Sequence, residues 1–330
     1  MIIVRIVPGA GMGNQMFMYA AGLAAASRLN TELLLDNADF QYSDRDDRDY
    51  QLSFFPEITE RSASFIDIWR MSPGTAVMNA ISRRQIKKYH IFRRLVRKSI
   101  KIMHLAPIHN KYFTQIAQDG PFPYPYKSSP RLFMENNAHK NRFAEIPDNT
   151  YLRGHWESED YFADYADLVR MKFTFAQECF DPKLTAEVRT CEAVAVHVRR
   201  GDKAEDNSFY GSNERYLRLA MEKISGLTFR PRFFVFSDDI EWCRETLPKI
   251  HDTDYTFIEG RTPPQDMALM TQCRHVIVGP STFSWWGAWL NDNPNKIIIA
   301  PDINLWYKQL TPSVIEDRKY LLPREWIKIR

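Results

Sequence analysis

The chain contains few cysteines, and none of them is arranged in a recognisable motif. There are four in 330 residues, Cys179, Cys191, Cys243 and Cys273, at wide and irregular intervals. The absence of a C-x-x-C pair argues against a cysteine-based zinc or redox site, and four cysteines in a chain of this length are no disulfide scaffold. We therefore expect reduced and mostly buried thiols.

The chain also has little net charge and no long apolar run. Its 44 Lys and Arg residues nearly balance 41 Asp and Glu residues, giving +3, which is too small to indicate a nucleic-acid partner. No run of about 18 apolar residues could span a membrane, and the first residues lack the charged leader of a secretory signal. We expect a cytoplasmic protein.

The basic residues are concentrated in one stretch. Residues 83–101 hold nine Lys or Arg and no acidic residue. Two interpretations stay open: a solvated helical surface, or a peripheral patch that binds anionic lipid headgroups at the inner membrane face.

The order of apolar and polar runs predicts two α/β domains, the usual outcome for a chain too long for one core. A strand at 2–7, a glycine-rich loop, a helix and a strand at 31–36 begin the first domain, which we place at 1–190. The second domain, at 191–330, alternates strands and helices as parallel α/β sheets do, and its last ~20 residues are expected to cross back to the first domain. The expected strands of the second domain are 192–198, 232–239, 255–260, 275–279 and 296–301, and its expected helices lie near 213–225, 240–247, 265–273 and 281–291.

The strand at 192–198 ends in two adjacent arginines. Successive side chains of a strand face opposite ways, so His197 and Arg199 share one face while Arg200 takes the other. We therefore expect Arg199 to meet a ligand, and Arg200 to hold the local turn against Asp202.

Two further strand ends are polar. Residues 236–239 read FSDD, whose Asp238 and Asp239 could bind a metal, accept ribose or base hydrogen bonds, or cap the following helix with Ser237 as a further candidate. We favour a role without metal. At Gly279-Pro280 another strand ends before a helix that Ser281 or Thr282 would cap, and a helix N-terminus suits a phosphate.

The motifs GMGNQMFMYAAGLA, GHWESEDYF, HVRRGD, FVFSDD and DMALMTQCRHVIVGPSTFSWWGAWLN together resemble glycosyltransferase family 11, the bacterial-type α-1,2-fucosyltransferases. The resemblance runs from residue 11 to about 291. It implies a GT-B fold, in which two Rossmann-like α/β domains face a cleft and the C-terminal domain holds GDP-fucose. It also implies inverting transfer of L-fucose to the 2-hydroxyl of a galactosyl acceptor glycan, without metal or other cofactor.

The resemblance also implies roles for particular residues. Arg199 matches the arginine that neutralises the donor diphosphate, and His197 and Asp266 match positions near the nucleoside. The phosphate-binding helix start corresponds to Ser281, Thr282 and Phe283, and the N-terminal-loop residues that face the reacting sugar correspond to Gly13 and Asn14. Many relatives have asparagine where this chain has Pro280.

The strand ends and the family resemblance together give the expected site residues. The catalytic candidates are Arg199, Asp202 and Asn14, and the donor-binding candidates are His197, Arg199, Arg200, Ser237, Asp238, Asp266, Ser281, Thr282, Phe283 and Gly13. The general base stays open between Asp202 and the departing phosphate. Two rival functions also stay open: transfer of another nucleotide sugar on the same fold, and nucleotide-sugar binding without turnover.

Overall fold

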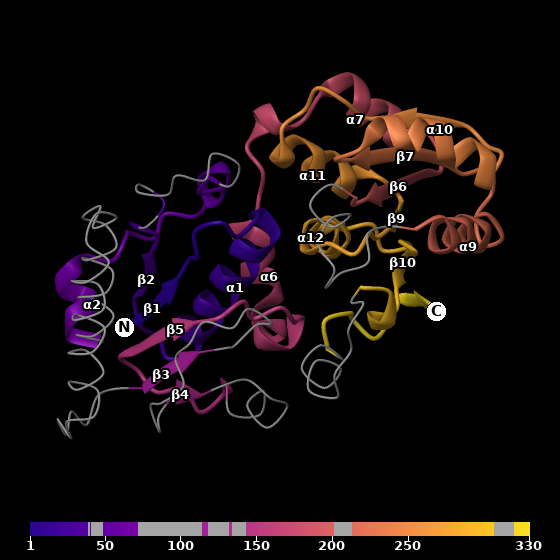
Figure 1. The fold of residues 1–330 in the computed structure, drawn as a ribbon. Coiled ribbons are helices and arrows are strands. Elements are labelled where there is room, and N and C mark those ends of the chain that lie inside the picture. Colours follow the sequence, from indigo (N-terminus) through magenta and orange to yellow (C-terminus); the bar gives the residue numbers. More distant parts are fainter. Residues whose placement is uncertain are drawn as a thin grey trace, which may run out of the picture. The chain divides into compact units, whose positions relative to one another are not determined.

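The computed structural model describes residues 1–38, 40, 49–71, 114–117, 132–133, 143–200, 213–306 and 320–330. They belong to two compact units: Met1–Ser53 with Glu57–Lys172, and Phe54–Pro56 with Phe173–Arg330 (Figure 1). The basic stretch 83–101 and the candidate Asp202 lie outside the described residues.

The first unit is built on a parallel sheet whose strands follow the order β2-β1-β5-β3-β4 (Figure 1). The strands are β1 (Ile2–Arg5), β2 (Leu33–Asp36), β3 (Thr114–Ala117), β4 (Leu132–Phe133) and β5 (Thr150–Arg153). The helices that the structure describes in this unit are α1 (Met12–Arg28), α2 (Phe65–Met71) and α6 (Ala166–Lys172).

Helix α1 lies unusually close to the sheet because of one glycine. A Cβ added at Gly22 would lie 2.8 Å from Cβ of Val4, closer than side-chain atoms pack. Most residues of α1 are buried, which agrees with the run of Ala, Met and Leu in its sequence. The helix begins at Met12, so Gly13 and Asn14 lie in its first turn and not in a loop as the sequence predicted.

The second unit holds a six-stranded parallel sheet in the order β11-β10-β9-β6-β7-β8. Its strands are β6 (Ala193–Val198), β7 (Arg232–Ser237), β8 (Tyr255–Phe257), β9 (His275–Ile277), β10 (Ile298–Pro301) and β11 (Ile327–Ile329). Within its described residues, the helices are α7 (Pro182–Arg189), α9 (Glu214–Ser225), α10 (Ile240–Ile250), α11 (Pro263–Gln272) and α12 (Thr282–Leu290).

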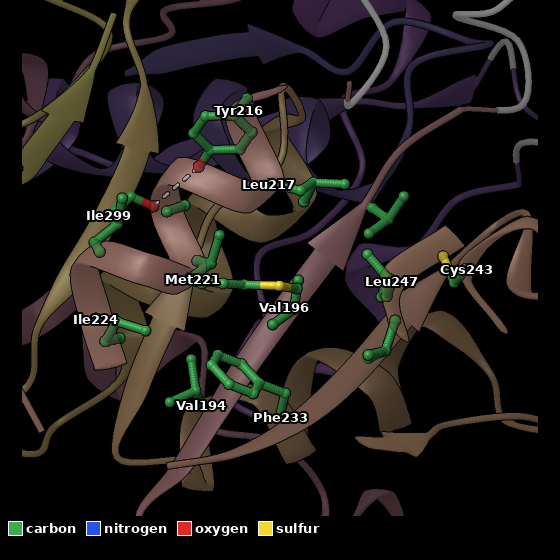
Figure 2. Packing of buried hydrophobic residues seen from close by; sticks show 14 residues of the cluster. Val194, Val196, Tyr216, Leu217, Met221, Ile224, Phe233, Cys243, Leu247 and Ile299 are labelled. Carbon is green, nitrogen blue, oxygen red and sulfur yellow. Dashed lines mark hydrogen bonds between the residues drawn. The ribbon is translucent and has the colours of Figure 1, made fainter. Parts of the chain in front are cut away.

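Alternation along β6 divides its side chains between two helical layers. Val194, Val196 and Val198 belong to an apolar cluster with α9 and α10 (Figure 2). The hydroxyl of Tyr216 on α9 donates to the carbonyl of Ile299 on β10 at 3.3 Å, a contact drawn in Figure 2. The opposite face of β6 carries His197, whose ring lies 5.5 Å from the ring of Phe283 on α12.

The predicted α/β class, with two parallel-sheet units as in GT-B proteins, is confirmed. The units divide after Lys172, whereas the sequence analysis placed the boundary at residue 190. Phe173 explains the difference, because its ring packs 5.0 Å from the Trp286 ring of α12 in the second unit. The cleft between the domains stays a prediction.

The end of the chain adds a strand to the second sheet. Residues 327–329 form β11, which pairs with β10 of the second unit. Trp285 fixes the preceding segment, because its indole Nε1 donates to the carbonyl of Leu321 at 2.7 Å and its ring packs 5.6 Å from Trp326. Residues 320–330 thus complete the second sheet. The expected packing of the last ~20 residues on the first unit stays a prediction.

Two expectations about absences can be compared with the structure. All four cysteines are free thiols, and three of them, Cys179, Cys243 and Cys273, are buried. Among the helices that the structure describes, none has the length and apolar character needed to cross a bilayer.

Candidate active site

The second sheet has a topological switch point between β6 and β9. Numbered along the unit, its strand order is 3-2-1-4-5-6, the order of dinucleotide-binding Rossmann folds. The connections leave β6 and β9 in opposite directions, and ligands of such sheets bind at the carboxyl ends of these two strands. Residues that follow Val198 and Ile277 are therefore the candidates for ligand contact.

His197 is the last residue of β6 whose side chain lies on the α12 face of the sheet. Its side chain is buried, and its Nδ1 has no hydrogen-bond partner among the described residues. Burial, and secondarily the Arg199 charge, lower the pKa of His197 to about 4, although the nearby Asp238 carboxylate opposes the shift. A neutral imidazole with an unpartnered nitrogen can accept or donate one hydrogen bond to a ligand.

Arg199 directly follows the last residue of β6. Its Nη1 lies 2.9 Å from Oδ2 of Asp238, the residue that follows β7. The pair is half-buried, with 28% of the arginine side chain and 24% of the aspartate side chain exposed. A guanidinium at this edge can neutralise an anionic group, since its planar donors match phosphate oxygens.

Arg200 has a separate set of partners. Its Nε donates to Oδ2 of Asp239 at 3.1 Å, and its guanidinium carbon lies 4.0 Å from the ring centroid of Trp242 on α10. The sequence analysis paired Arg200 with Asp202, which lies outside the described residues; the described partner is Asp239. A charge pair and a cation–π contact both hold this arginine against α10.

The FSDD turn is occupied by contacts within the protein. Ser237 Oγ accepts from the backbone N–H of Asp239 at 2.9 Å, and Oδ1 of Asp239 accepts from the N–H of Trp242 at 3.3 Å, capping α10. Asp238 uses Oδ1 for the backbone N–H of Arg200 at 2.9 Å and Oδ2 for Arg199. Among the alternatives left open for this motif, the helix cap is present and is made by Asp239.

The start of α12 supplies the third part of the site. Ser281 is the N-cap, and its Oγ accepts from the backbone N–H of Phe283 at 3.3 Å. Thr282 is the first residue of the helix. Ser281, Thr282 and Phe283 are all half-buried, and the contact between Phe283 and His197 joins this helix start to the end of β6.

Asp266 lies in the first turn of α11, and its described contacts are with Arg261. Its Oδ1 lies 3.4 Å from Nε of Arg261, while Nη2 of the same arginine donates to the carbonyl of Gln265 at 3.1 Å. Burial raises the pKa of Asp266 to about 6, and Arg261 partly offsets the rise. No described contact joins Asp266 to the Arg199–Asp238 pair.

Gly13 and Asn14 belong to the first unit, whereas the other described candidates belong to the second. Gly13 is buried and Asn14 half-buried, and the N–H of Asn14 donates to the carbonyl of Gly11 at 3.0 Å. The sequence analysis missed the adjacent Gln15, which is fully buried. Its side-chain nitrogen donates to the carbonyls of Ala10 and Asp49, so it fixes the segment before the helix. A polar residue inside an otherwise apolar helical run was the signal for it.

The described residues contain no cluster of three or more His, Cys, Asp or Glu side chains suited to a metal ion. Asp238 and Asp239, the pair with the clearest resemblance to a metal motif, have their carboxylates engaged by two arginines and two backbone N–H groups. In the described residues, the two carboxylates pair with Arg199 and Arg200.

The buried neutral His197 predicts a pH dependence of stability. Its pKa is lowered from 6.5 to about 4 on folding, so between these values the unfolded chain binds a proton that the folded chain does not. Stability is therefore lost as the pH falls from 6.5 towards 4, by about 3 kcal/mol for a shift of this size. Asp266, whose pKa is raised to about 6, acts in the opposite direction over a similar range.

A His197→Gln variant isolates the histidine, since Asp266 is present in both proteins. We expect the stability advantage of the wild type over His197→Gln to shrink as the pH is lowered from 7 to 4.5. Urea unfolding followed by circular dichroism measures the difference in the free energy of unfolding between the two proteins at each pH. A difference that stayed constant over this range would contradict the assignment of a neutral His197.

A parallel sheet with this strand order and with cations at its switch point is the architecture of a nucleotide-binding α/β protein. The model of the family "Glycosyl transferase family 11" matches residues 131–330. An α-1,2-colitosyltransferase of Escherichia coli is 30% identical over 99% of this chain and 99% of its own length. The chain therefore belongs to glycosyltransferase family 11, as the motifs predicted.

The chain is also similar to two fucosyltransferases, one in part of its sequence and one at low sequence identity. The galactoside α-(1,2)-fucosyltransferase 1 of Mus musculus is 39% identical over 32% of this chain and 29% of its own length. The crystal structure of NodZ α-1,6-fucosyltransferase soaked with GDP-fucose covers 94% of this chain and 97% of its own, with 16% identity and a TM-score of 0.47. The catalytic and donor-binding roles of individual residues stay predictions.

Proposed function

We propose that this glycosyltransferase moves L-fucose from GDP-β-L-fucose to the 2-hydroxyl of a galactosyl residue, with inversion at the transferred carbon. The observation that carries the proposal is the group of Arg199, His197 and the α12 start at the switch point of the second sheet. One fixed cation and one helix N-terminus at this edge suit a diphosphate.

The chemistry requires charge stabilisation at the leaving group. The bond between the sugar C1 and the diphosphate oxygen breaks with its electron pair on the diphosphate, while the acceptor oxygen bonds to C1 from the opposite face. Arg199 and the N-terminal dipole of α12 act where negative charge grows, so they stabilise the transition state more than the bound donor. The acceptor hydroxyl loses its proton either to Asp202 or to the departing phosphate.

The experiment is a determination of the product linkage. Purified protein is incubated with GDP-fucose and a panel of β-galactosides, and the products are analysed by NMR. We expect fucose in α-1,2 linkage to galactose. A different linkage would refute the acceptor hydroxyl, and failure with every acceptor would favour a nucleotide-sugar-binding protein without turnover.

One relative, the E. coli α-1,2-colitosyltransferase, suggests GDP-linked colitose as the alternative donor. Colitose is 3-deoxy-L-fucose, so the two sugars differ by one hydroxyl group. Sites built to bond a hydroxyl reject the analogue that lacks it far more strongly than apolar pockets reject an added one. Competition between GDP-fucose and its 3-deoxy counterpart in one assay identifies the donor, and we expect a higher kcat/KM for GDP-fucose.

The nucleotide is tested independently of turnover. We expect GDP to raise the stability of the protein and UDP to leave it unchanged, since a ligand at 100 times its Kd adds about 2.7 kcal/mol. Stabilisation by UDP alone would reject a GDP-linked donor.

We expect the activity to be independent of metal ions. The carboxylates of Asp238 and Asp239 are paired with Arg199 and Arg200 and so are poorly placed to ligate a metal. Arg199 is the cation that we propose for the diphosphate. Initial rates in excess EDTA should equal those without it. Loss of activity in EDTA, with recovery on adding Mn²⁺ or Mg²⁺, would contradict this expectation.

The acceptor proposed here is lipid-linked, presented at an anionic membrane surface that the basic stretch 83–101 contacts. The described helix α2, which precedes this stretch, exposes Phe65, Ile66 and Trp69, with 44%, 59% and 46% of each residue accessible. Exposed apolar and aromatic residues, together with a basic stretch in the same sequence region, favour binding at the membrane interface. Reversing charges in 83–101 should abolish sedimentation with anionic liposomes, and zwitterionic liposomes serve as the control. Unchanged sedimentation with anionic liposomes would exclude this contact.

A further inference from the structure

The ends of β6 and β7 are joined through one carboxylate. The two strands pair in register, with Val198 opposite Ser237, so Arg199 and Asp238 follow at matching positions. Asp238 accepts from the Arg199 side chain through Oδ2 at 2.9 Å and from the Arg200 backbone N–H through Oδ1 at 2.9 Å. One side chain therefore holds both the guanidinium of Arg199 and the backbone that leads away from it.

We infer that Asp238 is a positioning residue for Arg199, and not a ligand of the donor ribose or base. The inference rests on the proposed function, in which Arg199 meets the donor diphosphate. Asp238 fixes the Arg199 guanidinium before the donor binds, so that the cation needs little rearrangement when charge develops on the leaving group.

The contacts of Asp238 favour a positioning role. Each of its carboxylate oxygens already accepts one hydrogen bond or ion pair from the protein, which holds the carboxylate in place beside Arg199. A carboxylate beside a diphosphate repels it unless a cation lies between them, and Arg199 is that cation. The half-buried setting also limits screening of the ion pair by salt.

Positioning and competition predict opposite results when the Asp238 charge is removed. If the carboxylate positions Arg199, its loss lets the guanidinium move, and a misplacement of about 1 Å can cost on the order of a hundredfold in rate. If it merely competes with the diphosphate for Arg199, its loss strengthens GDP binding and leaves kcat unchanged or higher.

The chain offers a matched control for this variant. Nη2 of Arg232, at the amino end of β7, lies 2.9 Å from Oε1 of Glu187, a half-buried ion pair of the same length. Glu187→Gln removes the charge there, as Asp238→Asn does at the carboxyl end of the same strand. Asn at 238 still accepts the N–H of Arg200, so the turn is kept.

The experiment measures kcat and KM for GDP-fucose in the wild type, Asp238→Asn, Glu187→Gln, Arg199→Ala and the Asp238→Asn/Arg199→Ala double variant. We expect Asp238→Asn to lower kcat by about tenfold or more with KM changed by less than about threefold, and Glu187→Gln to stay within about twofold. The double variant should be no slower than Arg199→Ala, because a positioning residue has no effect without the group it positions.

Three outcomes would overturn the inference: an unchanged kcat with tighter GDP binding, an Asp238→Asn variant as active as Glu187→Gln, or losses that multiply in the double variant. An Arg199→Ala enzyme that kept most of its activity would remove the group that Asp238 is inferred to position, whereas a wild type that transfers no fucose would refute the proposed function. If Asp238→Asn does not fold, Asp238→Glu decides the matter, since it keeps the charge. Positioning predicts an intermediate kcat for it, and a role of charge alone predicts the wild-type kcat.

Discussion

Arg199→Ala is expected to lower kcat/KM for the proposed fucosyl transfer by about a hundredfold or more, the scale of losing one preorganised charge-stabilising donor. The residue follows β6 at the switch point of the Rossmann-type sheet and carries a half-buried cation. Its loss also leaves the Asp238 carboxylate facing the site without its partner, which disfavours a diphosphate further. Initial rates over a range of GDP-fucose concentrations, with the acceptor saturating, measure the effect.

Arg232→Ala is the control for this substitution. Arg232 is the first residue of β7 and pairs with Glu187, so the variant loses a similar ion pair at the opposite end of the sheet. We expect its kcat/KM to stay within about twofold of the wild type. An Arg199→Ala enzyme that kept most of its activity would remove Arg199 from the mechanism.

The elements of the second unit were predictable because each strand is a short apolar run bounded by polar or helical sequence. The run 193–198 is buried throughout, as a parallel strand covered on both faces should be. This result depends only on local periodicity. The two arginines have separate partners, since Arg199 pairs with Asp238 while Arg200 lies over Trp242 of α10. That His197 and Arg199 share one face stays a prediction.

The partner of Arg200 could not be predicted in the same way. The nearest carboxylate in sequence is Asp202, but the described partner is Asp239, 39 residues away. The register between β6 and β7 brings this pair together, and register is a property of strand pairing that a single strand does not encode.

The division of the chain was misplaced for a related reason. Residues 173–189 contain α7, whose N-cap Asp181 and first-turn Pro182 are recognisable start signals. Long-range contacts assign them to the second unit: Phe173 packs on Trp286, and Glu187 of α7 pairs with Arg232 of β7. The pairing of β11 with β10 is also a long-range contact. It was not predicted, because a short terminal strand carries little periodicity of its own.

Trp286→Ala is expected to lower the free energy of unfolding of the second unit by about 3–5 kcal/mol, the usual cost of truncating a large aromatic residue in a core. Trp286 is fully buried, and its ring lies 5.0 Å from those of Phe173 and Trp285 and 5.3 Å from that of Trp289. These contacts anchor α12, whose first turn holds the proposed phosphate-binding residues, so GDP affinity should fall with stability.

Chemical denaturation followed by circular dichroism, with GDP binding measured on the same samples, tests this expectation. Phe229→Ala is the matched control in the same unit, because 79% of Phe229 is exposed and surface truncations change stability by no more than about 0.5 kcal/mol. If Trp286→Ala were as stable as Phe229→Ala, the tryptophan would not anchor the helix. If it were destabilised but bound GDP as tightly as the wild type, the start of α12 would be independent of this core, since lost packing would otherwise loosen the N-terminal turn.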